Sequence, residues 1–145
     1  MDSHRSVSIE RVGDGEHEAV NRRGGRLRIG HGDDGDFTPT ELLLAAVGAC
    51  TGIDVDTLTS RRAQPEAFTV RVDAQKIRDE SGNRLDDIVV TFHVALPDTD
   101  AGRAAREQLP GFVQRSHDRL CTVSRTIELG TAVSVRIEES PFTAR

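Results

Sequence analysis

Residues 39–50 read PTELLLAAVGAC, and their composition is that of a buried helix. Proline is tolerated in the first turn of a helix, and the residues from 42 to 49 are apolar or small on nearly every side of the helix axis. A helix that is apolar all round belongs in the interior of a protein. The pattern predicts a long buried central helix that begins near Pro39 and ends near Arg62, before Pro65.

Alternating apolar and polar residues on both sides of this helix predict antiparallel strands. Three strands are expected before it, at about 6–12, 16–21 and 25–30, with a turn at residues 23–25. After it we expect a hairpin that turns at residues 81–83. One face of this hairpin is expected to be buried, and its residues are Phe68, Val70, Val72, Ala74, Ile88, Val90, Phe92 and Val94.

The C-terminal third is expected to add helices and a last strand. A charged amphipathic helix is predicted over about 100–119, kinked or split at Pro110-Gly111, and a short helical turn over Thr122–Glu128. A final strand is predicted through Val133, Val135 and Ile137. With no internal repeat in its 145 residues, the chain is expected to form one domain, 1–145, of the α+β class.

The predicted central helix needs more cover than one copy of this chain supplies. Its apolar residues surround the helix axis, whereas the domain offers only roughly five or six short strands and one further helix. A second copy of the chain is the simplest source of the missing cover. The sequence therefore predicts an intertwined homodimer.

The amino-acid composition argues against two classes of binding partner, nucleic acids and membranes. The net charge is −5, the basic residues are scattered, and Trp and Tyr are absent, so nucleic acid is not expected as a partner. No apolar run is judged long enough to span a bilayer, and residues 1–5 lack the apolar block of a signal peptide. We therefore expect a cytoplasmic protein with no membrane partner.

The two cysteines, Cys50 and Cys121, are the candidate reactive groups. Two cysteines are too few for a disulfide framework, so they are either inert core thiols or a reactive pair. Cys50 follows small residues that leave it close to neighbouring backbone, and Cys121 precedes a helical turn whose free N–H groups would favour its thiolate. These contexts predict a thiol redox site, in which the order of attack stays open.

Metal binding by Cys50, Cys121, His117 and Asp54 is the rival chemistry at these positions. No close Cys-x-x-Cys or His-x-x-x-His spacing supports it, so no metal is expected. His117, one turn before Cys121, is a candidate proton donor for a thiol reaction.

Two stretches of the chain resemble the OsmC/Ohr family, the osmotically inducible and organic-hydroperoxide-resistance proteins. They are residues 39–50 and the segment HDRLCTVSR at 117–125, and the order of strands and helices agrees over nearly the whole chain. The resemblance implies an OsmC-like fold and an obligate intertwined dimer with two active sites at the interface. It also implies a thiol-dependent peroxidase, in which organic hydroperoxides oxidise Cys50 and Cys121 resolves the product to a disulfide. A dithiol such as a lipoyl protein would reduce that disulfide, with no metal or organic cofactor.

The same resemblance implies an activating arginine that pairs with a glutamate. Cys50 lies too far into its helix for the helix dipole to ionise it, because that effect fades within the first turn. Arg28 on the third strand is the first candidate, and Arg26, on the same face of that strand, is the second.

The glutamate and the residue one turn after Cys50 depart from the family pattern. The family's glutamate falls at Thr40 here, whereas Glu41 lies on the opposite side of the helix from Cys50. A carboxylate at Asp54 would raise the pKa of the Cys50 thiol. Both departures favour the alternative, a non-peroxidatic OsmC-fold protein with a binding or redox-responsive role.

Overall fold

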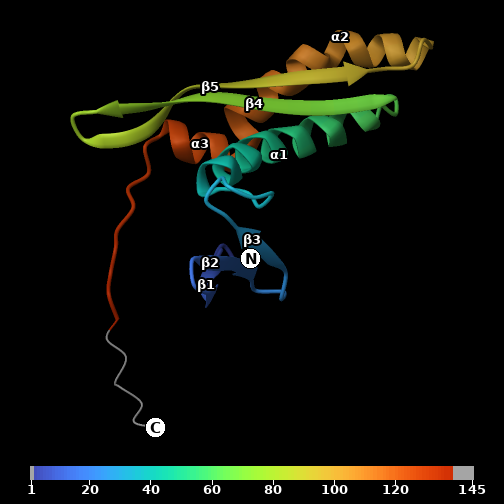
Figure 1. The fold of residues 1–145 in the computed structure, drawn as a ribbon. Coiled ribbons are helices and arrows are strands. Elements are labelled where there is room, and N and C mark those ends of the chain that lie inside the picture. The colour runs from blue at the N-terminus through green and yellow to red at the C-terminus, as the bar shows by residue number, and fades with distance from the viewer. Residues whose placement is uncertain (1, 139–145) are drawn as a thin grey trace.

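The computed structural model of this protein describes residues 2–138, and it has two antiparallel sheets, one long helix and a smaller helical layer (Figure 1). The α+β class predicted from the sequence is confirmed. Strands β1, β2 and β3 form one sheet in that order, and β4 and β5 form a long hairpin. The elements are β1 Val7–Gly13, β2 Glu16–Asn21, β3 Arg26–Ile29, α1 Pro39–Ser60, β4 Ala67–Asp79, β5 Gly82–Ala95, α2 Asp100–Arg115, the π-helical turn η1 Ser116–Leu120 and α3 Thr122–Glu128.

Helix α1 begins where the sequence predicts because Thr38 caps it. The backbone N–H of Glu41 donates to Thr38 Oγ1, and the Glu41 carboxylate accepts from the Thr38 backbone N–H at 3.0 Å. This reciprocal pair satisfies two backbone donors that the first turn of a helix leaves free. Proline at position 39 has no N–H to lose, so it fits the first helical position.

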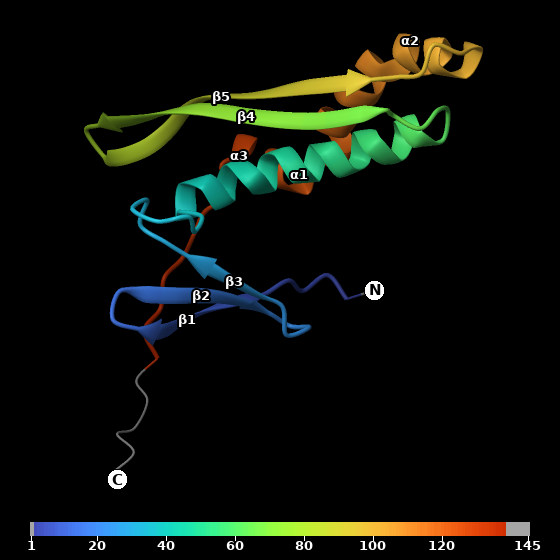
Figure 2. The same ribbon diagram turned by 45° about the vertical axis from the view of Figure 1, so that its right-hand side comes forward.

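Helix α1 runs alongside the hairpin and lies very close to β4 (Figures 1 and 2). Gly48 and Gly52 permit this approach. A Cβ atom on Gly48 would lie 2.6 Å from Val72 Cγ2, and one on Gly52 would lie 3.1 Å from Val70 Cγ2. The hairpin presents the predicted alternating face to the helix, including an edge-to-face contact of two phenylalanine rings, Phe68 and Phe92.

A single subunit does not cover α1 on all sides, which agrees with the expectation that one copy of the chain is too small to do so. One face is buried, and it carries Val47, Gly48, Thr51, Gly52, Val55 and Thr59. On the rest of the helix Leu43 is 41% exposed and Ile53 is 66% exposed. The hairpin and the C-terminal helices pack against only one side of α1. Apolar side chains on the rest of the helix therefore stay exposed in a single subunit.

By length and composition α1 is also apolar enough to cross a membrane, contrary to the expectation from the sequence. Its apolar window has a mean hydropathy of 1.5, and 33% of that window is buried within the subunit. The core helix of a folded domain meets the same criterion, and α1 packs against β4, β5 and α2.

The three-stranded sheet stands apart from the other elements, joined to them through the segment that leads into α1 (Figures 1 and 2). Its strands confirm the ranges predicted from the sequence, but apolar side chains on them are open to solvent: Val7, Ile9, Val12 and Leu27.

The final strand predicted through Val133, Val135 and Ile137 is not formed. These three side chains are 88–90% exposed, and the described part of this segment, up to residue 138, has no regular secondary structure. A strand needs a neighbouring strand to bond its N–H and C=O groups. Figure 1 shows the segment leaving the hairpin and α3 and descending at one side of the three-stranded sheet, and within residues 2–138 it pairs with no strand of either sheet.

Helix α2 continues through Pro110, so the chain is not split there into two helices. Proline removes the N–H that would bond to the carbonyl of Arg106. Both residues are exposed, so solvent can satisfy that carbonyl without a break in the helix. The helix then widens into η1 and leads to α3, which spans the predicted range Thr122–Glu128.

Candidate functional site

The fold brings the two thiols together from distant parts of the chain. Cys50 lies in the middle of α1, Cys121 is the N-cap of α3, and α3 packs against α1. Both cysteines are free. They differ in access, because Cys121 is fully buried and Cys50 is partly exposed.

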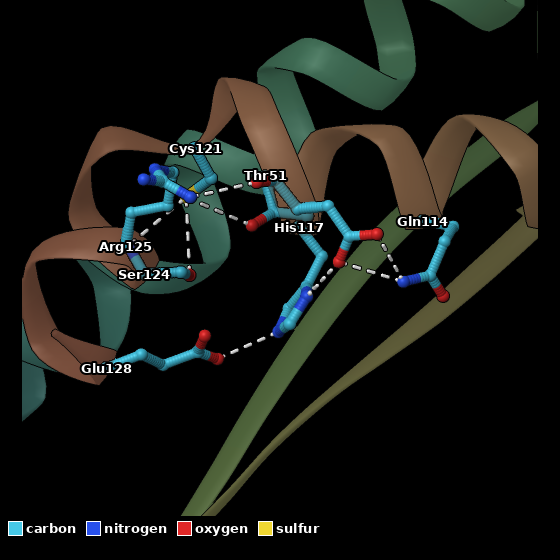
Figure 3. Close-up of polar contacts among 8 residues, drawn as sticks. Thr51, Gln114, His117, Cys121, Ser124, Arg125 and Glu128 are labelled. Carbon is cyan, nitrogen blue, oxygen red and sulfur yellow. Dashed lines mark hydrogen bonds and ion pairs between the residues drawn. The ribbon is translucent and has the colours of Figure 1, made fainter.

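The Cys121 sulfur is surrounded by hydrogen-bond partners (Figure 3). Thr51 Oγ1 donates to it at 3.3 Å, Ser124 Oγ lies at 3.3 Å, and the Ser124 backbone N–H donates to it at 3.4 Å. Burial, the largest single influence, would raise the pKa of Cys121, but these bonds and one from Cys50 together lower that pKa below its ordinary value. Cys121 is therefore a buried sulfur prepared to carry negative charge.

At the Cys50 sulfur, the influences that raise the pKa outweigh the one that lowers it. Burial is the main cause that raises the pKa of Cys50, and the hydrogen bond to Cys121 and the Asp54 carboxylate raise it further. Only the backbone N–H of Val123 acts in the other direction. The Asp54 carboxylate is held in place by Ser116, whose hydroxyl donates to it at 2.9 Å. In a single subunit Cys50 is thus the accessible thiol but the less readily ionised one.

Arg28 and Glu41 have other partners within the subunit. Arg28 pairs with Asp36 at 3.2 Å and with Glu16 at 3.6 Å, and Glu41 belongs to the cap of α1. Within residues 2–138 of one chain, no hydrogen bond or ion pair joins either residue to Cys50. A role for them at the thiol stays a prediction and requires a second copy of the chain.

A cleft of about 650 Å³ adjoins the thiol pair on the side of Thr51 and Ser124. Its wall is mostly apolar, with contributions from β5, α2 and α3, and neither cysteine reaches it. His117 lies on the wall, with Nε2 2.8 Å from Glu128 and Nδ1 3.1 Å from Asp118 (Figure 3). The hydrogen bond to Asp118, and then the charge of Glu128, raise the pKa of His117 although partial burial lowers it.

Sequence reasoning did not identify Thr51 and Ser124 as part of the site. Ser124 had a usable signal, because it follows the helix-capping Cys121 by the three positions that a capping contact requires. Thr51 had none, since its partner lies far along the chain. No group of three or more metal-ligating side chains is assembled in the part of the chain that the structure describes.

Comparison with known proteins places these features in a family. The family profile described as OsmC-like protein matches residues 30–137. An uncharacterized protein of Mycobacterium tuberculosis is 31% identical over 131 residues, which cover 89% of this chain and 93% of that protein.

Two solved structures of proteins described as OsmC or OsmC-like share the fold of this chain. One is an OsmC-like protein of unknown function from Vibrio cholerae, with a TM-score of 0.68, 13% identity and coverage of 88% of this chain and 95% of that one. The other is an organic hydroperoxide resistance protein, OsmC, from Legionella pneumophila, with a TM-score of 0.61, 15% identity and coverage of 87% and 91%.

Proposed function

Because this chain belongs to the OsmC-like protein family, we propose that it is a thiol-dependent peroxidase that reduces organic hydroperoxides. Family membership and solved relatives that are named for organic hydroperoxide resistance support a redox or peroxidase role. The observation that carries the finer proposal is the contact between two free thiols, of which one is accessible and the other is buried and stabilised as an anion.

In the proposed reaction Cys50 attacks first, because Cys50 is the partly exposed cysteine and Cys121 is fully buried. Its thiolate attacks one peroxide oxygen, the O–O bond breaks, and the alkoxide leaves as an alcohol after it takes a proton. Cys50 becomes a sulfenic acid. A thiol of ordinary pKa, about 8.5, is only slightly ionised at neutral pH, so the step needs positive charge near Cys50.

Cys121 then resolves the sulfenic acid. Its thiolate attacks the Cys50 sulfur, the S–O bond breaks, and the oxygen leaves as hydroxide, which takes a proton from solvent to become water; the product is a Cys50–Cys121 disulfide. A dithiol, such as a lipoyl protein, reduces that bond and completes the cycle. No metal or organic cofactor takes part.

A homodimer would supply what one subunit lacks at this site. A second copy would cover the exposed face of α1 that carries Ile53, and it would offer Arg28 from its own three-stranded sheet as the activating charge. We propose that Glu41 and Arg28 act together only in that assembly, and that the protein is cytoplasmic and has no nucleic-acid or membrane partner.

A non-peroxidatic binding or redox-responsive role is the second candidate. It is favoured by the ion pairs that occupy Arg28, the capping role of Glu41 and the Asp54 carboxylate that raises the pKa of Cys50. A protein of this class would form the disulfide slowly and would not turn over hydroperoxide.

Stopped-flow oxidation of the reduced protein by cumene hydroperoxide and by hydrogen peroxide distinguishes the two roles. A peroxidase should react faster with cumene hydroperoxide and lose two hydrogens per chain in the intact mass. The Cys121→Ser variant should consume one equivalent of peroxide and accumulate a sulfenic acid that a dimedone-type probe traps, whereas Cys50→Ser should do neither. Variants that both react like the wild type would contradict the peroxidase.

A further inference from the structure

We propose that a thiol reductant attacks Cys50, not Cys121, when it opens the Cys50–Cys121 disulfide, and that Thr51 and Ser124 are positioning residues that hold Cys121 as the departing thiolate. The inference rests on the proposed function, because it concerns the reductive half of the same thiol cycle. It fixes which sulfur receives the reductant.

Access to the two sulfurs is the first argument. Thiol–disulfide exchange requires the incoming sulfur to approach opposite the sulfur that leaves. Cys121 is fully buried, and the residues against its sulfur, Thr51 and Ser124, are themselves 4% and 8% exposed. An approach to Cys121 would have to displace them, whereas Cys50 is partly exposed on α1 in a single subunit.

The two sulfurs also differ in their hydrogen-bond partners and in the charges near them. Two hydroxyls and one backbone N–H surround Cys121, at 3.3–3.4 Å, and such bonds are strongest when the acceptor is charged. Cys50 has one backbone donor, from Val123, and a carboxylate nearby, Asp54, which disfavours a negative charge on its sulfur. The better leaving group in exchange is the sulfur with the more stable thiolate, which is Cys121.

The step balances with a dithiol as the only co-reactant. The reductant thiolate forms a bond to Cys50 Sγ, the bond between Cys50 and Cys121 breaks, and its electron pair stays on Cys121 Sγ. The second thiol of the reductant then attacks the mixed disulfide and expels Cys50 as a thiolate, which takes up a proton. The reductant leaves as its own disulfide after giving up two electrons.

The test uses the full-length protein oxidised with diamide, which forms the disulfide without any peroxide. Oxidised protein is exposed briefly to 2-mercaptoethanol, quenched in acid, digested with pepsin and analysed by mass spectrometry for the mixed disulfide. We expect the adduct on Cys50. An adduct on Cys121, or equal amounts on both, would overturn the proposal, as would failure of diamide to form the bond. If the protein did not turn over peroxide, the proposed peroxidase function would be wrong, but the position of the adduct would still test which cysteine the reductant attacks.

Variants of the two hydroxyl residues test their positioning role. Thr51→Val and Ser124→Ala should each slow reduction of the disulfide by dithiothreitol about threefold to tenfold, and should increase the fraction of adduct on Cys121. Thr57→Val is the matched control, because Thr57 is exposed and its hydroxyl bonds only to the carbonyl of Ile53 in its own helix. A reduction rate and adduct ratio that equal those of the control would overturn the role of these residues.

Discussion

Within one subunit, the groups around Cys50 do not offset the negative charge of its thiolate. The Asp54 carboxylate stands one turn along α1, the Cys121 sulfur is in contact, and within the described part of the subunit no cationic side chain forms an ion pair with either cysteine or Asp54. We therefore expect that fast reaction with peroxide depends on a guanidinium that reaches Cys50 from a second subunit. The chain carries almost all its positive charge as arginine, which is suited to that task because it stays charged at every relevant pH.

Replacement of Arg28 by alanine should therefore slow the first oxidation step, by roughly tenfold if the guanidinium shifts the pKa of Cys50 by about one unit. The fold should be little affected, since the ion pairs of Arg28 are about half exposed and screened by solvent. Stopped-flow oxidation and urea unfolding measure the two effects. Arg84→Ala, which removes a similarly exposed pair on the hairpin, is the control. A wild-type oxidation rate in Arg28→Ala would exclude this arginine from the site.

The contact between α1 and β4 sets the position of Cys50. Gly48 lies two residues before it and directly against Val72, so any side chain there pushes the helix away from the sheet. The close approach explains why small residues precede the cysteine: they let the helix backbone reach the hairpin.

Gly48→Ala should destabilise the protein by about 1–3 kcal/mol, because the new methyl group overpacks the contact with Val72. Gly111→Ala in α2 should instead stabilise it by about 0.5–1 kcal/mol, since a Cβ there meets open space and alanine favours helix. Urea unfolding at one fixed protein concentration compares the two. Equal effects of both substitutions would show that helix propensity, not packing, determines the outcome.

His117 joins η1 to α3 through its contact with Glu128. Because folding raises the pKa of His117 above its unfolded value, its contribution to stability is fully present below about pH 6.5 and is lost as pH rises through the folded pKa. The stability difference between the wild type and His117→Gln should therefore shrink as the pH is raised from about 6 to values well above 6.5. Urea midpoints across that range measure it, and a difference that does not change with pH would contradict the assigned contact.

The local sequence pattern predicted where helices and strands lie better than it predicted what packs against them. The limits of α1, α3 and the hairpin followed approximately from proline and turn residues and from apolar spacing, which are local signals. The helix is not split at Pro110, because exposure, not sequence, decides whether solvent can replace a lost hydrogen bond. Thr51 was missed because its contact with Cys121 arises only when distant segments pack together.

At the level of the whole subunit, several of the described segments expose apolar side chains, and three of these places bear on assembly. One is the face of α1 that carries Ile53, another is the three-stranded sheet, and the third is the segment around Val135. Large exposed apolar patches are typical of interaction surfaces. The proposed second copy of the chain would cover these surfaces, because each copy has both an uncovered helix face and strands with exposed apolar side chains.

The dimer should persist at nanomolar concentration, because separation would expose the α1 face again. Sedimentation at decreasing concentration measures this, and a folded monomer would contradict it. Ile53→Glu should weaken the dimer, since it places a charge on the uncovered face of α1. Retention of the same sedimentation coefficient by this variant at nanomolar concentration would exclude that face from the interface.

The N-cap of α3 is a sulfur atom in the position where serine, threonine, aspartate or asparagine usually supplies an oxygen. Disulfide formation would weaken that cap, because a bonded sulfur carries no charge and is drawn toward Cys50. The first turn of α3 should then open more often, and the amides of Val123 and Ser124 should exchange with deuterium faster in the oxidised protein. Exchange rates that do not change on oxidation would contradict this. A partner protein that recognised the loosened turn would thereby distinguish the oxidised protein from the reduced one.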